Sequence, residues 1–243
     1  GDIIPLKKRA RRYDFFCTYR HRTQYFFICS PILLFFPIFA LRHCMTDDYI
    51  DIHTHRFTGR GIELRAAGVH PWRAAEVGAA ESLSPAMFEG ARAVGETGLD
   101  YACDVDRKAQ ERLFRRHLEI AERLRLPVVI HCVRAFEPTM KILAEYRLAA
   151  VIFHGFIGSA QMAERAVAEG YYLSFGVMTP RSPKTVAALR STPDDRLFAE
   201  TDDSGADIER VYAMIAEIRG TDTESLKRVI TENYKRIFDD ENQ

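Results

Sequence analysis

The sequence predicts an α/β protein built as a β/α barrel, and two observations lead to that prediction. From Tyr49 onward, short apolar runs rich in β-branched residues alternate about seven times with longer amphipathic segments, which is the pattern of parallel βαβ units. Polar or ionisable residues follow six of these runs. Because the carboxyl ends of barrel strands converge on one mouth, whereas a doubly wound sheet concentrates function at one switch point, six polar strand ends favour the barrel.

The expected strands are short and apolar. They cover residues 49–52, 62–69, 91–95, 127–130, 149–153, 171–175 and 197–199. The clearest helix runs from Asp106 to Leu124, where apolar residues recur at three- and four-residue spacing and form one face. Residues 159–169 and 207–219 show the same spacing, and Gly220 follows the second of these helices at the position where helices commonly end.

Residues 1–44 differ in composition from the rest of the chain, and we expect them to be an extension outside a folded domain at 45–243. They carry 8 basic and 2 acidic side chains, whereas the remainder carries 26 basic and 32 acidic ones. Basic residues between Lys7 and Arg12 precede an apolar run at 25–41 that two prolines interrupt. Because this order is also typical of a signal or anchor, the alternative to a cytoplasmic protein is one anchored to a membrane through 25–41.

Charge and cysteine content exclude several classes of protein. The chain has 34 Lys and Arg against 34 Asp and Glu, so it is not a globally basic nucleic-acid coat. A polyanion would have to bind at a local site where metal ions supply the positive charge. The five cysteines contain no C-x-x-C pair, which predicts neither a disulfide framework nor a zinc finger.

Six residues at strand ends form a candidate metal centre. They are His53, His55, Glu96, His131, His154 and Asp202. His53 and His55 lie one residue apart, so both side chains face the same side of an extended strand and can bind one cation. Six ligands are too many for one tetrahedral ion with an open position, but they match two ions that share a carboxylate such as Glu96. The donor set suits zinc, manganese or iron, and magnesium where fewer nitrogens bind.

Single residues near these positions also have ordinary structural explanations. A lone histidine such as His70 or His117 is at least as often a hydrogen-bonded core residue as a ligand. Cys132 is expected to be a small buried residue, and Asp100 to cap a turn. Trp72 either plugs the rim of the barrel or joins His70 in stacking against a nucleotide.

The ordered motifs of the chain resemble those of the TatD family of metal-dependent hydrolases between about Tyr49 and Phe238. The motifs lie at Asp51–His55, Gly68–Trp72, Gly95–Tyr101, Gln110–His117, Pro127–His131, Phe153–Phe156 and Glu200–Asp202. Each motif is weak alone, but the whole series in this order is specific. The resemblance implies a β/α barrel of the amidohydrolase-like type and a metal-dependent DNase activity.

The resemblance also implies how the metal centre is divided between two ions, which we expect to be Mg, Mn or Zn. Glu96 would contact both ions. The remaining ligands would be His53, His55 and Asp202 for one ion and His131 and His154 for the other.

The chain departs from the family pattern beside this centre. After Asp202 the usual proline-tyrosine-leucine loop and its basic, asparagine-containing stretch are replaced by residues 203–207 and a helix. His131 is followed by Cys132, Val133 and Arg134, and the chain from Met45 is shorter than typical members. These differences predict a somewhat shortened barrel with a more open rim, or a different ester as substrate.

The leading hypothesis is hydrolysis of a phosphodiester in DNA, and the family resemblance favours single-stranded DNA. Asp202 and Glu96 are the expected catalytic residues, because Asp202 can both bind an ion and accept the proton of the attacking water. Residues expected to bind the substrate are His70, Arg134 and Lys184.

Two other functions stay open at this point. A hydrolase of the same architecture that cleaves a carbon–nitrogen bond or a carboxylic ester would use the same activated water. Many such barrels bridge their ions with a modified lysine, so Glu96 at this position favours the nuclease. A catalytically silent scaffold would be expected to have lost a ligand, and no obligate protein partner is evident from the sequence.

Overall fold

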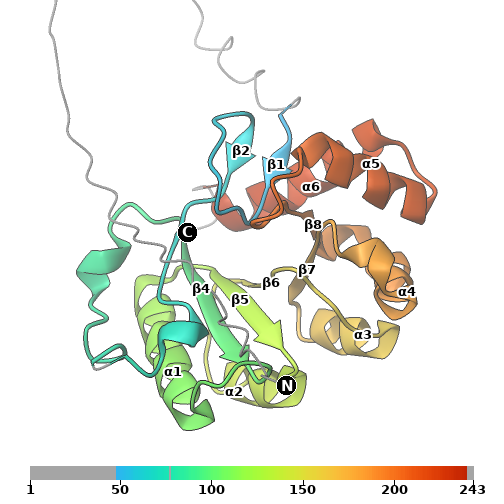
Figure 1. Cartoon of the computed structure of the whole chain (residues 1–243). Helices are drawn as coiled ribbons and strands as arrows, with labels where there is room; N and C mark the ends of the chain where they lie inside the picture. Colours follow the sequence, from blue (N-terminus) through green and yellow to red (C-terminus); the bar gives the residue numbers. More distant parts are fainter. Residues whose placement is uncertain (1–47, 77, 240–243) are drawn as a thin grey trace, which may run out of the picture. The chain divides into compact units, whose positions relative to one another are not determined.

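The computed structural model describes residues 48–76 and 78–239 of the 243-residue chain, and strands and helices alternate along most of them (Figure 1). The strands are β1 (Ile50–Asp51), β2 (Ile62–Glu63), β3 (Ala66–Ala67), β4 (Ala93–Asp100), β5 (Val128–Val133), β6 (Val151–Phe153), β7 (Tyr172–Phe175) and β8 (Leu197–Ala199). The α-helices are α1 (Arg107–Leu124), α2 (Phe136–Leu143), α3 (Ala160–Ala168), α4 (Pro183–Ser191), α5 (Ile208–Arg219) and α6 (Thr223–Phe238). Short 3-10 helices include η2 (Pro71–Arg73) and η3 (Pro85–Phe88).

The strands pair in parallel and form a ring. β3 to β8 make one sheet in sequence order, and β1 pairs with β2. β2 and β3 belong to one extended stretch broken only at residues 64–65, so this stretch joins the two sheets. On the other side, the amide of Ile52 donates to the carbonyl of Ala199 (3.1 Å) and that of Asp202 to the carbonyl of His53 (2.9 Å). β1 therefore also lies beside β8, and the predicted β/α barrel is confirmed.

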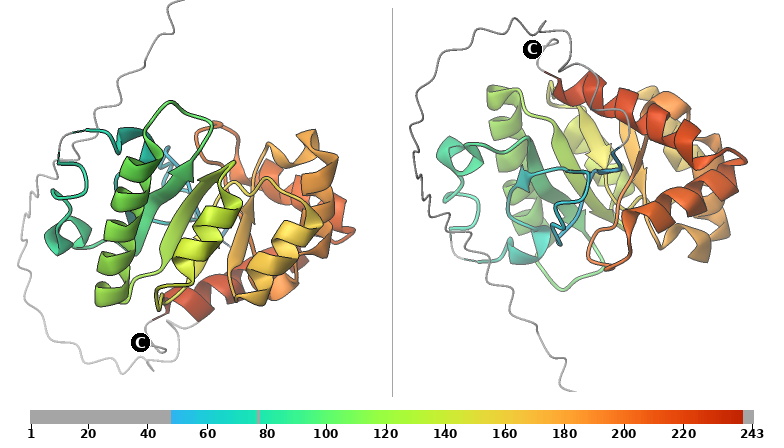
Figure 2. Two further views of the ribbon diagram at one scale, coloured as in Figure 1. Left: turned by 90° about the horizontal axis from the view of Figure 1, so that it is seen from below. Right: turned by 90° about the horizontal axis from the view of Figure 1, so that it is seen from above.

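The helices lie outside the strands and cover the ring (Figure 2). α1 begins where the Asp106 carboxylate accepts a hydrogen bond from the backbone amide of Ala109 (2.8 Å). It ends at Arg125, whose φ of 53° is left-handed and stops the helix. Phe114 and Leu118 on its inner face are fully buried, as the apolar spacing of this segment predicts.

The structure has three helices that the sequence analysis does not predict: α2, α4 and α6. α2 and α4 have only 8 and 9 residues, so their apolar spacing extends over little more than two turns. α6 has the clear four-residue pattern Leu226, Ile230, Tyr234 and Phe238, and its apolar side packs against β1 and β8. α6 is thus part of what encloses the ring.

β4 is longer than the sequence predicts, and a β-bulge in it aims the side chain of Glu96. Val94 pairs with Val128 of β5, but Thr97 pairs with Ile130, so β4 has one residue more than β5 between the two pairs. Such an extra residue bends the strand and interrupts the alternation of side chains. Glu96 lies in this irregular stretch, and its side chain is only 8% exposed.

The N-terminal residues 1–47 lie outside the described residues, and so do the expected extension and its apolar run at 25–41. The boundary of the folded domain at residue 45 therefore stays a prediction. Within residues 48–76 and 78–239, no helix combines the length and the apolar character that crossing a bilayer requires.

Candidate metal centre

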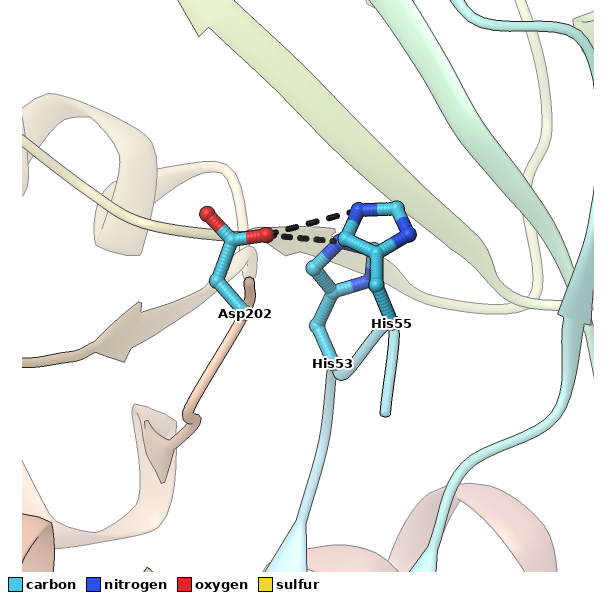
Figure 3. Close-up of side chains that lie close together, drawn as sticks. All are labelled: His53, His55 and Asp202. Atoms are coloured by element: carbon cyan, nitrogen blue, oxygen red, sulfur yellow. Dashed lines mark ion pairs between the residues drawn. The ribbon is translucent and has the colours of Figure 1, made fainter. Parts of the chain in front are cut away.

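The structure brings all six residues of the predicted metal centre together: four of them follow strands, whereas Glu96 lies within β4 and His131 within β5. His53 and His55 follow β1, and Asp202 follows β8 on the neighbouring side of the ring. Figure 3 shows both imidazoles directed at the Asp202 carboxylate: Oδ1 lies 3.7 Å from Nε2 of His53 and 3.4 Å from Nε2 of His55. The two histidines thus share a face, as their spacing predicts.

Glu96 lies at the middle of the cluster, and its two carboxylate oxygens face different histidines. Oε2 is 3.4 Å from Nε2 of both His53 and His55. Oε1 is 2.6 Å from Nδ1 of His131 and 2.7 Å from Nε2 of His154. The carboxylate therefore stands between two groups of imidazoles that come from opposite sides of the ring.

His70, which the sequence analysis places among the substrate-binding residues, belongs to the second of these groups. Its Nε2 lies 3.3 Å from Oε1 of Glu96, and its ring centre lies 4.5 Å from that of His131. The backbone amide of Trp72 donates to Nδ1 of His70 (3.2 Å), which leaves Nε2 for the cluster. His70 is thus a candidate ligand.

Several sets of three donors in the described residues are close enough to hold a cation. These sets are His53, His55 and Asp202; His53, Glu96 and His154; His70, Glu96 and His131; and His154, Glu200 and Asp202. Within each set the donor atoms lie within 4.8 Å of one another. The first and third sets have no residue in common, so both can be occupied at once.

Two buried atoms of the cluster have no hydrogen-bond partner among the described residues. They are Nε2 of His53 and Oε2 of Glu200. Unpartnered buried polar atoms are rare in folded proteins, because each loses its hydration without compensation. Imidazole nitrogen and carboxylate oxygen are the ligand types of zinc, manganese and related divalent ions. The residues present therefore fit a metal centre.

The electrostatics keep the central carboxylate ionised. Burial by itself raises the pKa of Glu96, but the charge of His154 and hydrogen bonds from His131 and His154 outweigh burial and hold its pKa well below the usual range. For His154 burial lowers the pKa, and the charges of Glu96 and Glu200 more than reverse this. Since a ligating imidazole must be neutral, binding of a cation at His154 would release its proton.

Asp100 contacts the ring nitrogen of His131 that points away from Glu96. Its Oδ1 accepts from the amide of Ala102 (2.8 Å), which is the predicted turn cap. Its Oδ2 lies 3.2 Å from Nε2 of His131 and accepts a hydrogen bond from Nε1 of Trp72 (2.6 Å). A carboxylate on the far nitrogen of a metal-binding histidine fixes its tautomer and orientation. His131 is accordingly held with Nδ1 toward Glu96.

Glu200 is a residue of the cluster that the sequence prediction omits. Its side chain is buried, and its Oε1 lies 3.3 Å from Nδ1 of His154. Glu200 and Asp202 are two positions apart just after β8, so they share a face for the same reason as the two histidines after β1. That spacing is the signal by which the sequence could have revealed Glu200.

The backbone of Asp202 is fixed in an unusual conformation. Its φ of 53° is left-handed, which few residues other than glycine, asparagine and aspartate adopt. Its amide donates to the carbonyl of His53 (2.9 Å), and its own carbonyl accepts from the amide of His55 (3.2 Å). These two hydrogen bonds hold the carboxylate opposite both imidazoles.

Two predicted substrate-binding residues and one cysteine lie apart from these contacts. Arg134 directly follows β5 and Lys184 lies in the first turn of α4; both are exposed. Neither forms a hydrogen bond or ion pair with the cluster within the described residues. Burial raises the pKa of the Cys132 thiol to about 11, so this cysteine is not poised as a nucleophile.

A β/α ring whose strand ends carry converging histidines and carboxylates is the architecture of metal-dependent hydrolases. The family described as TatD related DNase matches residues 59–239 of the chain. The chain belongs to this family.

Three relatives illustrate the match. YabD of Bacillus subtilis (strain 168), named an uncharacterized metal-dependent hydrolase, is 34% identical over 164 residues, which are 60% of this chain and 64% of YabD. The human protein named deoxyribonuclease TATDN3 is 27% identical over 60% of this chain and 59% of its own length. This chain thus spans less than two thirds of both proteins. The crystal structure of the TatD homolog YjjV from Escherichia coli K12 aligns with a TM-score of 0.61 and 29% identity, covering 72% of this chain and 76% of YjjV.

Proposed function

We propose that this protein is a hydrolase that uses two divalent ions to cleave phosphodiester bonds in DNA. The observation that carries the proposal is the position of Glu96, whose two oxygens face two separate groups of imidazoles. A carboxylate between two ions is the arrangement by which many hydrolases of phosphate esters join their metals. The deoxyribonuclease name of the human relative supports DNA as the substrate class.

In this proposal the ligands divide as the spatial groups do. His53, His55 and Asp202 would hold one ion, and His131, His154 and His70, which all lie close to Oε1 of Glu96, would hold the other, with Glu96 between them. Mg, Mn and Zn all accept this mixture of nitrogen and oxygen donors. When bound, such ions lower the pKa of a water molecule and neutralise charge that develops on a phosphoryl oxygen.

The side chains of the chain supply the remaining steps. The Asp202 carboxylate is 42% exposed, so solvent reaches it, and it accepts the proton of the attacking water. Asp100 keeps His131 oriented during the reaction. Arg134, just after β5, and Lys184, in the first turn of α4, are both exposed and would bind phosphates that flank the scissile bond.

The direct test is cleavage of end-labelled single-stranded DNA by the full chain with Mg²⁺ or Mn²⁺, with and without chelator. Asp202→Asn is the informative variant, because asparagine accepts the left-handed backbone at this position but is a poor proton acceptor. Loss of general-base catalysis is expected to slow cleavage about 10²- to 10⁴-fold. Asp203→Asn, the same change at the exposed neighbouring position, is the control and should cleave normally.

Cleavage that survives both chelation and Asp202→Asn would contradict the proposal. Absence of DNA cleavage, together with metal-dependent hydrolysis of an N-acylated amino acid or a carboxylic ester, would assign the protein to the amidohydrolase-like alternative instead.

A further inference from the structure

Trp72 is exposed at the mouth of the barrel but is held in one orientation. It lies in η2, the first helical segment after β3, and 61% of its surface is accessible to solvent. Its Nε1 donates to Oδ2 of Asp100 (2.6 Å), so the polar edge of the indole is satisfied. The part of the indole that remains accessible is therefore apolar, and an indole held in place in advance loses little entropy when a ligand covers it.

The indole stands beside the metal centre. Its ring centre is 4.6 Å from that of His70 and 6.4 Å from that of His131, with interplanar angles of 77° in both cases. Both imidazoles approach the same oxygen of Glu96. A group resting on the indole would therefore be next to whatever the centre binds. The structure excludes the alternative that Trp72 plugs the barrel, because most of its surface faces solvent.

Other exposed apolar side chains lie in segments that follow barrel strands. Five large apolar side chains are exposed in the described residues, and four of them follow the carboxyl ends of strands. These four, here called the apolar rim, are Phe57 after β1, Trp72 after β3, Ile157 after β6 and Met178 after β7. Exposed apolar residues scattered singly are ordinary, so Trp72, which contacts His70 and Asp100 beside the centre, is the member of this set that points to a ligand with apolar parts.

We propose that Trp72 is the platform on which the base of an unpaired nucleotide stacks, beside the phosphate that is cleaved. This inference rests on the proposed function. A nucleotide in a single strand combines an anionic phosphate for the centre with a planar base for the indole. In a duplex the base faces are covered by their neighbours, so the platform favours single strands and frayed ends. Trp72 acts here as a specificity residue that contacts substrate.

The chain offers a direct optical test, because Trp72 is its only tryptophan. The full chain is titrated in Mg²⁺ with a thymidine octamer that carries phosphorothioate linkages to slow cleavage. The control ligand is an abasic octamer with the same linkages. Stacking is expected to quench the tryptophan emission with the thymidine octamer, and to leave it unchanged with the abasic one or with the octamer annealed to its complement.

Variants separate stacking from a structural role, with affinity measured by anisotropy of a fluorescein-labelled octamer. Trp72→Ala should bind about 5- to 150-fold more weakly, as expected for loss of one base–aromatic stack. Trp72→Phe retains a flat ring but not the N–H to Asp100, and it should bind within about threefold of wild type. Met87→Ala, which changes the exposed apolar residue outside the apolar rim, should bind like wild type.

Two results would overturn the inference. One is octamer binding without quenching; the other is equal loss of affinity in Trp72→Phe and Trp72→Ala, which would mean that Trp72 only supports Asp100. Either result combined with metal-dependent DNA cleavage would leave the proposed function standing. If the octamer neither binds nor is cleaved in its ordinary phosphodiester form, the proposed function and this inference fail together.

Discussion

His117 allows a quantitative test of how one buried histidine sets the pH dependence of stability. The imidazole is fully buried in α1, where Nε2 accepts from the amide of Val69 (2.9 Å) and Nδ1 donates to the carbonyl of Leu113 (2.8 Å). Because one ring nitrogen accepts and the other donates, the imidazole is neutral, and both nitrogens are occupied by these hydrogen bonds. His117 is therefore a core residue and not a ligand. Burial lowers its pKa from 6.5 to about 4.

The sign of the effect follows from proton uptake. Between pH 6.5 and pH 4 the unfolded chain binds a proton at His117 that the folded protein does not bind. The contribution of this residue to the free energy of unfolding is therefore fully present above pH 6.5, and falls by up to about 1.4 kcal/mol for each pH unit below it. Between pH 7 and pH 5 the loss from this residue amounts to about 2 kcal/mol.

The substitution His117→Gln removes the titration while an amide can still accept from Val69 and donate to Leu113. Urea unfolding of both proteins at pH 7 and pH 5, with chelator in every sample, measures the effect. We expect the variant to be less stable at pH 7 by about 1 kcal/mol, from imperfect hydrogen bonds. At pH 5 this difference should shift in favour of the variant by about 2 kcal/mol. The same difference at both pH values would refute the reasoning.

Three further predictions concern the backbone and the centre. Gly98→Ala should lower the free energy of unfolding in urea by more than about 3 kcal/mol, because a Cβ there would lie 2.1 Å from the carbonyl oxygen of His131. Gly90→Ala is the control: its Cβ would have open space around it, so this change should lower the free energy of unfolding by only about 1 kcal/mol. Asn233→Ala should lower the free energy of unfolding in urea by about 2 kcal/mol, since the buried amide donates to the carbonyl of Asp194, which precedes β8, and to that of Leu197 in β8 (2.7 and 2.9 Å). Mn²⁺ at about 100 times its dissociation constant should stabilise the wild type by about 2.7 kcal/mol in a thermal melt, and Glu96→Gln should lose most of that gain; an undiminished shift would contradict the bridging position of Glu96.

The barrel and most of the metal centre could be predicted from the sequence, because both follow from the local periodicity of residue types. Six of the seven predicted strands are followed by polar residues, and parallel strands in a ring must bring those ends together. His53 and His55 could be placed on one face from their spacing alone. These features follow from the order and spacing of residues along the chain, so they can be predicted without a structure.

What the sequence does not disclose depends on tertiary geometry. The orientation of Glu96 follows from a bulge, which appears only when β4 and β5 are paired. The support of His131 by Asp100, and the hydrogen bond that fixes Trp72, join segments about 30 residues apart. His70 likewise reaches Glu96 through the curvature of the ring. These contacts could not be predicted, because no spacing along the chain encodes them.

The place where the ring closes has a consequence for how the protein matures. The seam between β1 and β8 joins residues about 150 positions apart, and the residues on both sides of it, His53, His55 and Asp202, are those proposed to hold the first ion. During synthesis the two histidines are made about 150 residues before Asp202, which is added when most of the chain is complete. A nascent or truncated chain that lacks β8 has only an incomplete ligand set. Binding of this first ion would therefore have to follow closure of the ring, whereas the set of His70, Glu96 and His131 is complete before β8 is made.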